Sequence, residues 1–182
     1  MVFKSIELIE ELKEYVKNHI SFVKSLQDIS DEKLQIKLNE VSWSVVECIE
    51  HLNLYSVFYN PEIKSKIKKT NTKGQEVFKS GYLGNKFSLY MLPKEGMKTM
   101  STFKSKNPIH SKLNSVDVLG RFISYQEELL ELLDLATNVD LTKVKTSITL
   151  PLLKFRLGDT FRFVIYHNER HIIQAKTILS KI

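Results

Sequence analysis

Residues 159–179 read DTFRFVIYHNERHIIQAKTIL, and the spacing of apolar side chains in this stretch decides the fold class. Side chains that recur every three or four positions lie on one face of an α-helix, which has about 3.6 residues per turn. We expect Asp159 or Thr160 to cap the first turn. The stretch therefore predicts a long helix near the end of the sequence. Its buried face carries, in order, Phe161, Val164, His167, Asn168, His171, Ala175 and Ile178.

The same period recurs in three other stretches, at residues 3–26, 45–63 and 116–136. The best candidate for a β-strand, residues 144–150, is short and is followed by Pro151. The sequence thus predicts an all-α protein, an up-and-down-type four-helix bundle. The gap between the second and third helices, about 45 residues, is unusually long for a loop in a compact domain. We therefore expect a long crossover segment between helices two and three.

The start of the second helix carries a capping signal. Either Ser42 or Ser44 can serve as the N-cap, and Glu47 stands at the capping-box distance from Ser44. We interpret Glu47 as the capping partner of Ser44. The alternative is that Glu47 orients His51, one turn further on, or supplies a base near a metal ion. Pro61 interrupts the apolar pattern, so a kink or an early end is expected there.

The crossover region is rich in lysine. Residues 61–112 contain twelve lysines, three acidic residues and no arginine, whereas the whole chain has a net charge of +6. Because most of these lysines do not share one helix face, we interpret the region as a solvated loop rather than a nucleic-acid surface. Its aromatic and aliphatic side chains need cover from water. We expect residues 84–92 to fold over the bundle as a short helix or packed loop.

Length and composition fit one domain that spans residues 1–182. No run of about 18 apolar residues is present, so no membrane segment is predicted. The first 15 residues mix charges into the apolar positions and lack the uncharged centre of a signal peptide, which predicts a cytoplasmic protein. Cys48 is the only cysteine, which excludes an intramolecular disulfide. We expect it to be a small buried hydrophobe.

Two histidines on the last helix suggest a metal site. His167 and His171 are four positions apart, so both imidazoles stand on one helix face and can reach one ion. The alternative is a pair of buried histidines satisfied by hydrogen bonds. The zinc-protease motif H-E-x-x-H is excluded because position 168 is Asn, and the inverted motif H-x-x-E-H is excluded because position 170 is Arg. Glu169 points away from His167 and should face solvent or a neighbouring helix.

A third ligand is needed, and His51 in the middle of the second helix is the natural candidate. Three neutral imidazoles leave coordination positions open for a substrate or a water. His19 and His110 lack such a context, and we predict that both are surface residues. Trp43 is interpreted as a packing anchor rather than a substrate platform. Asn168, beside both ligands of the last helix, can donate a hydrogen bond at the site or serve helix packing.

These motifs together carry a family resemblance. Residues 43–52 follow the pattern W-S-x-x-E-x-x-x-H-L and precede the H-x-x-x-H of residues 167–171. With Leu150-Pro151-Leu152 before the last helix and Gln174 after the histidine pair, the chain resembles the DinB-like (DinB/YfiT) family. The resemblance implies a four-helix bundle, often dimeric, that holds a divalent cation with three histidines. By residue matching, these are His51, His167 and His171, and nickel or zinc is the expected metal.

The resemblance implies less about the reaction than about the site. Characterised relatives include thiol-dependent transferases and isomerases that use low-molecular-weight thiols such as bacillithiol or mycothiol, and others are described as metal-dependent hydrolases. We therefore expect a metal-dependent enzyme, a thiol S-transferase or hydrolase, acting on a small-molecule substrate, with no catalytic residue assigned. A homodimer is the expected assembly, and neither a membrane nor a nucleic acid is an expected partner. The alternative is a non-catalytic dimeric binding or stress-response module whose metal is structural or absent.

Overall fold

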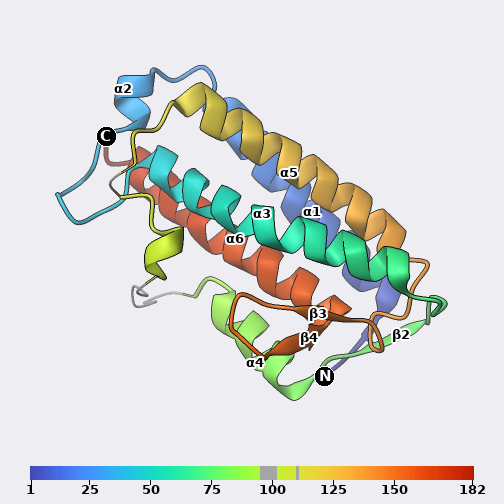
Figure 1. Cartoon of the computed structure of the whole chain (residues 1–182). Coiled ribbons are helices and arrows are strands. Elements are labelled where there is room, and N and C mark those ends of the chain that lie inside the picture. Colours follow the sequence, from blue (N-terminus) through green and yellow to red (C-terminus); the bar gives the residue numbers. More distant parts are fainter. Residues whose placement is uncertain (95–101, 110) are drawn as a thin grey trace.

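The computed structural model describes residues 1–94, 102–109 and 111–182. Their four longest helices pack side by side as a bundle (Figure 1). These helices are α1 (Ser5–Ser25), α3 (Val45–Lys69), α5 (Ser115–Ala136) and α6 (Leu157–Leu179). The structure confirms the predicted all-α bundle and its long crossover between the second and third of these helices. None of the helices in these residues is both long and apolar enough to cross a membrane.

Shorter elements decorate the bundle. They are the helices α2 (Asp31–Leu34), α4 (Tyr82–Met91) and η1 (Lys104–Lys106), a single 3-10 turn, and the strands β1 (Val2–Lys4), β2 (Val77–Lys79), β3 (Lys145–Ser147) and β4 (Lys154–Arg156). Strand β1 pairs antiparallel with β2, and β3 pairs antiparallel with β4. The strand β3 lies inside the predicted 144–150 candidate. The helix α4 covers the predicted 84–92 segment and packs on α6.

The crossover segment determines the direction of α5. Asn53 Nδ2 donates to the carbonyl of Val118 at 3.0 Å, and Asn60 Nδ2 donates to the carbonyl of Tyr125 at 2.9 Å. Residue numbers rise together along both helices, so α3 and α5 run parallel. A tight turn joins antiparallel neighbours, whereas parallel neighbours need a connection that returns along the bundle. The residues between α3 and α5 make this return.

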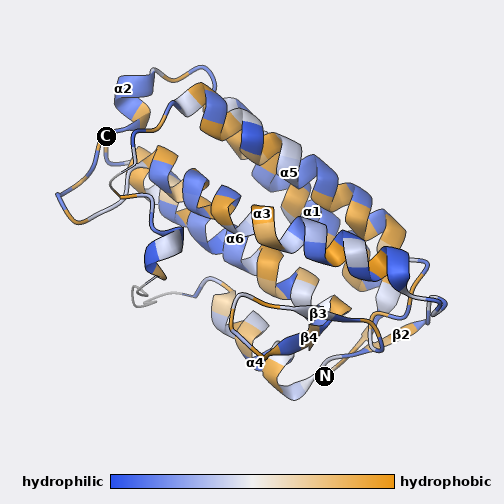
Figure 2. Ribbon diagram, in the orientation of Figure 1, coloured by the Kyte–Doolittle hydropathy of each residue, from blue (hydrophilic) through white to orange (hydrophobic). Residues whose placement is uncertain are grey.

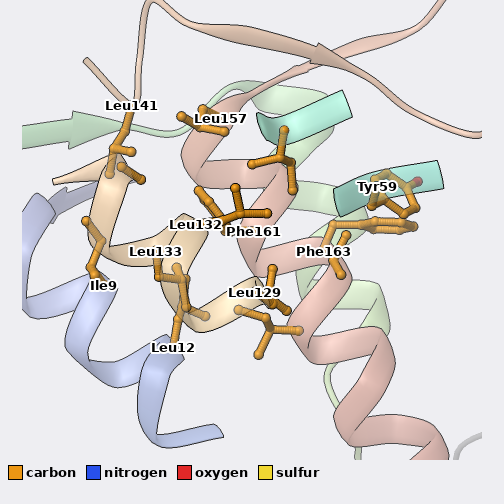
Figure 3. Packing of buried hydrophobic residues seen from close by; sticks show 14 of the residues in the cluster. Ile9, Leu12, Tyr59, Leu129, Leu132, Leu133, Leu141, Leu157, Phe161 and Phe163 are labelled. Carbon is orange, nitrogen blue, oxygen red and sulfur yellow. The ribbon is translucent and has the colours of Figure 1, made fainter. Parts of the chain in front are cut away.

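Two apolar clusters fill the bundle, one towards each end. In the first, Ile9 and Leu12 of α1 lie close to Leu133 of α5, with Phe161 of α6 nearby (Figure 3). The second cluster includes Leu52 of α3 and is otherwise formed by Val23, Leu26, Phe122, Ile172 and other side chains from the opposite end. Each long helix carries both apolar and polar residues (Figure 2), because one face packs in the core and another faces outward.

A layer of buried polar side chains lies where the two clusters meet. Every long helix contributes to it: His19 comes from α1, His51 and Asn53 from α3, Gln126 from α5, and His167 and Asn168 from α6. These side chains are at most 7% exposed. Burying so many polar groups costs stability unless partners satisfy them, so a layer of this kind points to function.

Several predicted helix ends are corrected by the structure. The helix α6 begins at Leu157, and neither Asp159 nor Thr160 caps it. Asp159 is instead fully buried, where its carboxylate accepts from Gly81 N at 2.7 Å and pairs with Arg162. The helix α3 continues through Pro61 without ending. Phe3 belongs to β1 rather than to the first helix.

The predicted capping box at the start of α3 is confirmed. Ser44 Oγ accepts from Glu47 N at 3.2 Å, and Glu47 Oε2 accepts from Ser44 N at 2.8 Å. The other oxygen of Glu47 pairs with Lys37 Nζ at 2.7 Å. Both oxygens of Glu47 are thus engaged at the helix start, and the capping interpretation of Glu47 is the correct one.

Replacing Ser44 by alanine should lower the free energy of unfolding by about 1 kcal/mol, because it leaves a helix-terminal N–H without its acceptor. Urea denaturation followed by circular dichroism measures this loss. Ser42→Ala, at the other cap candidate, is the matched control and should cost less. Equal losses in the two variants would contradict the assignment of the cap.

Candidate metal centre

The three histidines singled out in the sequence lie together in the structure. The Nε2 atoms of His51 and His167 are 3.2 Å apart. The ring centroid of His171 is 4.5 Å from that of His51 and 4.7 Å from that of His167. One nitrogen of each ring lies within 4.8 Å of a nitrogen of each of the others. Two histidines four positions apart on α6 and one histidine on α3 thus bring three imidazoles to one point.

Hydrogen bonds fix how two of these rings present their nitrogens. His51 Nδ1 lies 2.7 Å from the carbonyl oxygen of Lys106, which can only accept, so Nδ1 carries the proton. His171 Nδ1 donates to Gln174 Oε1 at 2.9 Å. In both rings the lone pair is therefore left on Nε2. Partners of this kind are what orient metal-ligating histidines in proteins.

The nitrogen spacing fits a metal ion. Two imidazole nitrogens at ~2.0–2.1 Å from a tetrahedral zinc ion stand about 3.3 Å apart. The 3.2 Å between the Nε2 atoms of His51 and His167 is close to this value. His51 Nε2 carries a lone pair, and at this distance either a proton on His167 Nε2 or a cation between the two nitrogens satisfies it. The donor set is therefore suited to a borderline cation such as Zn²⁺ or Ni²⁺.

The electrostatics favour the neutral, metal-ligating form of all three rings. Burial lowers the pKa of His51 to about 4, although its bond to the Lys106 carbonyl acts in the opposite direction. Burial, followed by repulsion from His51, lowers the pKa of His171 to about 3. The pKa of His167 is also well below its usual value, chiefly because the ring is buried. Metal ions bind neutral imidazole, so no proton needs to be displaced at neutral pH.

The histidines line a cavity of about 940 Å³, a volume typical of small-molecule sites. Trp43 lies at its wall, with its ring centroid 4.6 Å from that of His51 and 5.6 Å from that of His171. Thr102 and Phe103 of the crossover also line it. Trp43 is therefore more than a packing anchor, because it is part of the pocket. As the only tryptophan of the chain, it is also an intrinsic fluorescent reporter of this site.

The prediction for His19 is wrong. The side chain is fully buried, and its Nε2 lies 2.7 Å from Glu169 Oε2. Glu169 thus faces the neighbouring helix α1, one of the two orientations expected for it. The spacing of Val16, His19 and Val23 places all three on one helix face, a signal that would have identified His19 as buried. His110 lies outside the described residues.

The structure selects one of the two roles expected for Asn168 and adds Lys106 to the site. Asn168 Nδ2 donates to Gln126 Oε1 of α5 at 3.1 Å, so it serves helix packing rather than the histidine cluster. Lys106 was not recognised as a site residue. Its contribution is a backbone carbonyl from the distant crossover segment, and no side-chain pattern signals such a group. Cys48 is buried as predicted, and burial raises the pKa of its thiol.

Comparison with known proteins supports the same relationship that the motifs indicated. The family model described as the DinB superfamily matches residues 15–175, which include α3, α5 and all three histidines of the cluster. Searches of curated proteins and of solved structures gave no match. The matched region covers most of the chain and contains the whole candidate metal centre, so the protein belongs to the DinB superfamily.

Proposed function

We propose that this protein is a metal-dependent enzyme in which His51, His167 and His171 hold one divalent cation. The observation that carries the proposal is a cluster of three buried or half-buried imidazoles, with two lone pairs aimed inward, on the wall of a large cavity. Among the described residues, the metal-binding cluster includes no carboxylate or thiol. Three protein ligands are typical of catalytic sites, in which another coordination position remains for a substrate or water.

The residues around the cation have separable roles. The Lys106 carbonyl and Gln174 hold His51 and His171 in the tautomer that leaves Nε2 free. Trp43 lies against the ring of His51, and Tyr55 lies against the ring of His167, so both histidines are held in an aromatic wall of the cavity. A bound divalent cation would act as a Lewis acid towards a thiol, a water or a carbonyl oxygen. The proposed reaction is therefore thiol transfer to a small electrophile or hydrolysis, with nickel or zinc as the metal.

Metal analysis and activity assays test the proposal. Protein purified without a histidine tag should contain about one divalent ion per chain, and His51→Ala should contain almost none. The metal-loaded protein should then be assayed with an electrophile, with and without a low-molecular-weight thiol, and with an ester. Turnover only with the thiol identifies a transferase, and turnover without it identifies a hydrolase. Metal content that His51→Ala leaves unchanged would contradict the site.

Gln174→Leu should weaken metal binding by about 10–100-fold, because the variant no longer fixes the tautomer of His171. The measurement is a metal titration followed by Trp43 fluorescence, which Ni²⁺ or Cu²⁺ quenches at short range. Gln75→Leu, an exposed glutamine on the segment before β2, is the control and should bind metal like the parent protein. Identical affinities in the two variants would remove Gln174 from the site.

We also propose that the protein forms a homodimer, because the DinB-like family that it resembles is often dimeric. Light scattering during size-exclusion chromatography measures the mass of the particle and tests it. Three results together would favour the alternative of a non-catalytic module. The protein would be a dimer, chelation of the metal would lower its melting temperature, and it would show no activity towards thiol and electrophile pairs.

A further inference from the structure

The cavity beside the histidines has one end of mixed lining and one end that is largely apolar. The helices α3 and α6 run antiparallel, since Tyr59 contacts Phe163 and His51 contacts His171. Lining residues can therefore be ordered along the groove between them. Towards the start of α3, beyond His171, the lining is mixed: the polar residues Asn39, Ser42, Asn107 and Gln174 lie there together with Val41, Trp43, Ile109 and Ile173. Towards the start of α6, beyond His167, the lining residues are Tyr55, Phe87, Met91, Ile148, Leu150 and Phe163.

At the mixed end, the side-chain oxygens of the polar residues are engaged by contacts within the protein. Asn107 Oδ1 accepts from Trp43 Nε1 at 3.0 Å, and Ser42 Oγ donates to the carbonyl of Asn39 at 3.0 Å. Gln174 Oε1 is engaged by His171. These groups hold the loop, the tryptophan and a histidine in place. Their side-chain oxygens are therefore already committed to the protein.

The apolar end presents aromatic surface. The ring of Phe163 lies nearly parallel to that of His167, at 9° with centroids 6.4 Å apart. Phe155 contacts Phe163 on one side and Phe87 of α4 on the other, with centroids 5.9 and 5.6 Å apart. Phe163 and Phe87 line the cavity, and the buried ring of Phe155 packs between them and joins the histidine cluster to α4. Water against such a surface is released favourably when an apolar group replaces it.

We propose that the ligand of this site is a small organic molecule with a flat, aromatic body and a polar reactive head. The body lies between α4, Phe163 and the loop after β3, and the head reaches the histidines. This inference rests on the proposed metal-dependent function and adds the class of substrate to it. The cavity is large enough for a ligand of drug-like size, and its apolar lining with a few polar groups at one point is the usual design of such sites.

Two hydroxamates that share one metal-binding head test the inference on the zinc-loaded full chain. Acetohydroxamate carries a methyl group, and benzohydroxamate carries a phenyl ring. Isothermal titration should give benzohydroxamate an affinity at least about tenfold higher, because only the phenyl ring buries apolar area in the aromatic end. Equal affinities would overturn the proposed substrate class and leave the metal site intact.

Matched variants place the phenyl ring within the cavity. Leu150→Asp, at the aromatic end, should abolish the phenyl advantage and leave acetohydroxamate binding unchanged. Ile173→Asp makes the same kind of change at the other end and should keep the advantage. Phe87→Ala, on α4, gives a second test at the aromatic end if Leu150→Asp does not fold. Loss of the advantage in Ile173→Asp alone would overturn the assignment of the ends.

If the proposed function is wrong, the binding results differ from those expected when only the substrate class is wrong. If the protein binds zinc and neither hydroxamate, the metal has no open position, and both the enzyme proposal and the substrate class are overturned. If the protein takes up neither zinc nor nickel, as elemental analysis would show directly, the same conclusion follows. Only bound zinc together with a phenyl preference at the aromatic end supports the inference.

Discussion

His167→Phe is expected to abolish stoichiometric metal binding while the bundle stays folded. His167 is 7% exposed and lies among the rings of Tyr55, Phe163 and His51, so phenylalanine can fill its place without a nitrogen. Loss of a ligand should exceed the roughly 10–100-fold loss typical of groups that only orient one. We expect the dissociation constant to rise by more than about 100-fold. Elemental analysis and quenching of Trp43 fluorescence by Ni²⁺ measure the change.

His19→Gln is the matched control for this experiment. It also removes a fully buried histidine, but one that pairs with Glu169 on the α1 side of α6. Its metal content should equal that of the parent protein, although its stability falls. Equal loss of metal in both variants would mean that general destabilisation, rather than a missing ligand, explains the result. Circular dichroism separates the two cases.

The helical spacing of side chains predicted the part of the site that lies on regular helices. The interval between His167 and His171 placed both rings on one face, whereas His51 was chosen for its position in the middle of the second helix and for the order of motifs that the chain shares with the DinB-like family. The same reasoning failed for His19, because it placed this residue just off the apolar stripe of the first helix and therefore on the surface. A buried histidine is stable here because Glu169 accepts its hydrogen bond, and that partner is 150 positions away.

The sequence could not predict contacts made by residues in loops, because these contacts depend on how the loop folds. The Lys106 carbonyl reaches His51 because the crossover returns over the bundle, and every residue type offers a carbonyl. The strands β1–β4 are three residues long, which is too short for an alternating pattern to distinguish them. The parallel direction of α3 and α5 is seen in the hydrogen bonds that the side-chain amides of Asn53 and Asn60 donate to carbonyls of α5. No local preference encodes these contacts.

The metal-free protein should lose stability steeply as the pH falls from 7.5 to 5.5. His51 and His171 have folded-state pKa values of about 4 and about 3, whereas a histidine in the unfolded chain titrates near 6.5. Below pH ~6.5 the unfolded chain takes up protons that the folded chain excludes, so the free energy of unfolding falls. Each such histidine contributes a slope approaching about 1.4 kcal/mol per pH unit. His167, whose pKa is also lowered, adds to the effect.

Urea denaturation at several pH values, with and without one equivalent of zinc, measures this dependence. Bound metal competes with protons for the same nitrogens, so the loaded protein should keep its stability to a lower pH and then lose metal and structure together. His171→Gln removes one of the titrating rings, and its metal-free slope should be smaller by up to about 1.4 kcal/mol per pH unit. Two results would contradict this expectation: a free energy of unfolding that does not change between pH 7.5 and 5.5, or a pH slope in His171→Gln equal to that of the parent protein. Either result would show that these rings are protonated as readily in the folded chain as in the unfolded one. Buried neutral imidazoles would then not be the state that the bundle stabilises.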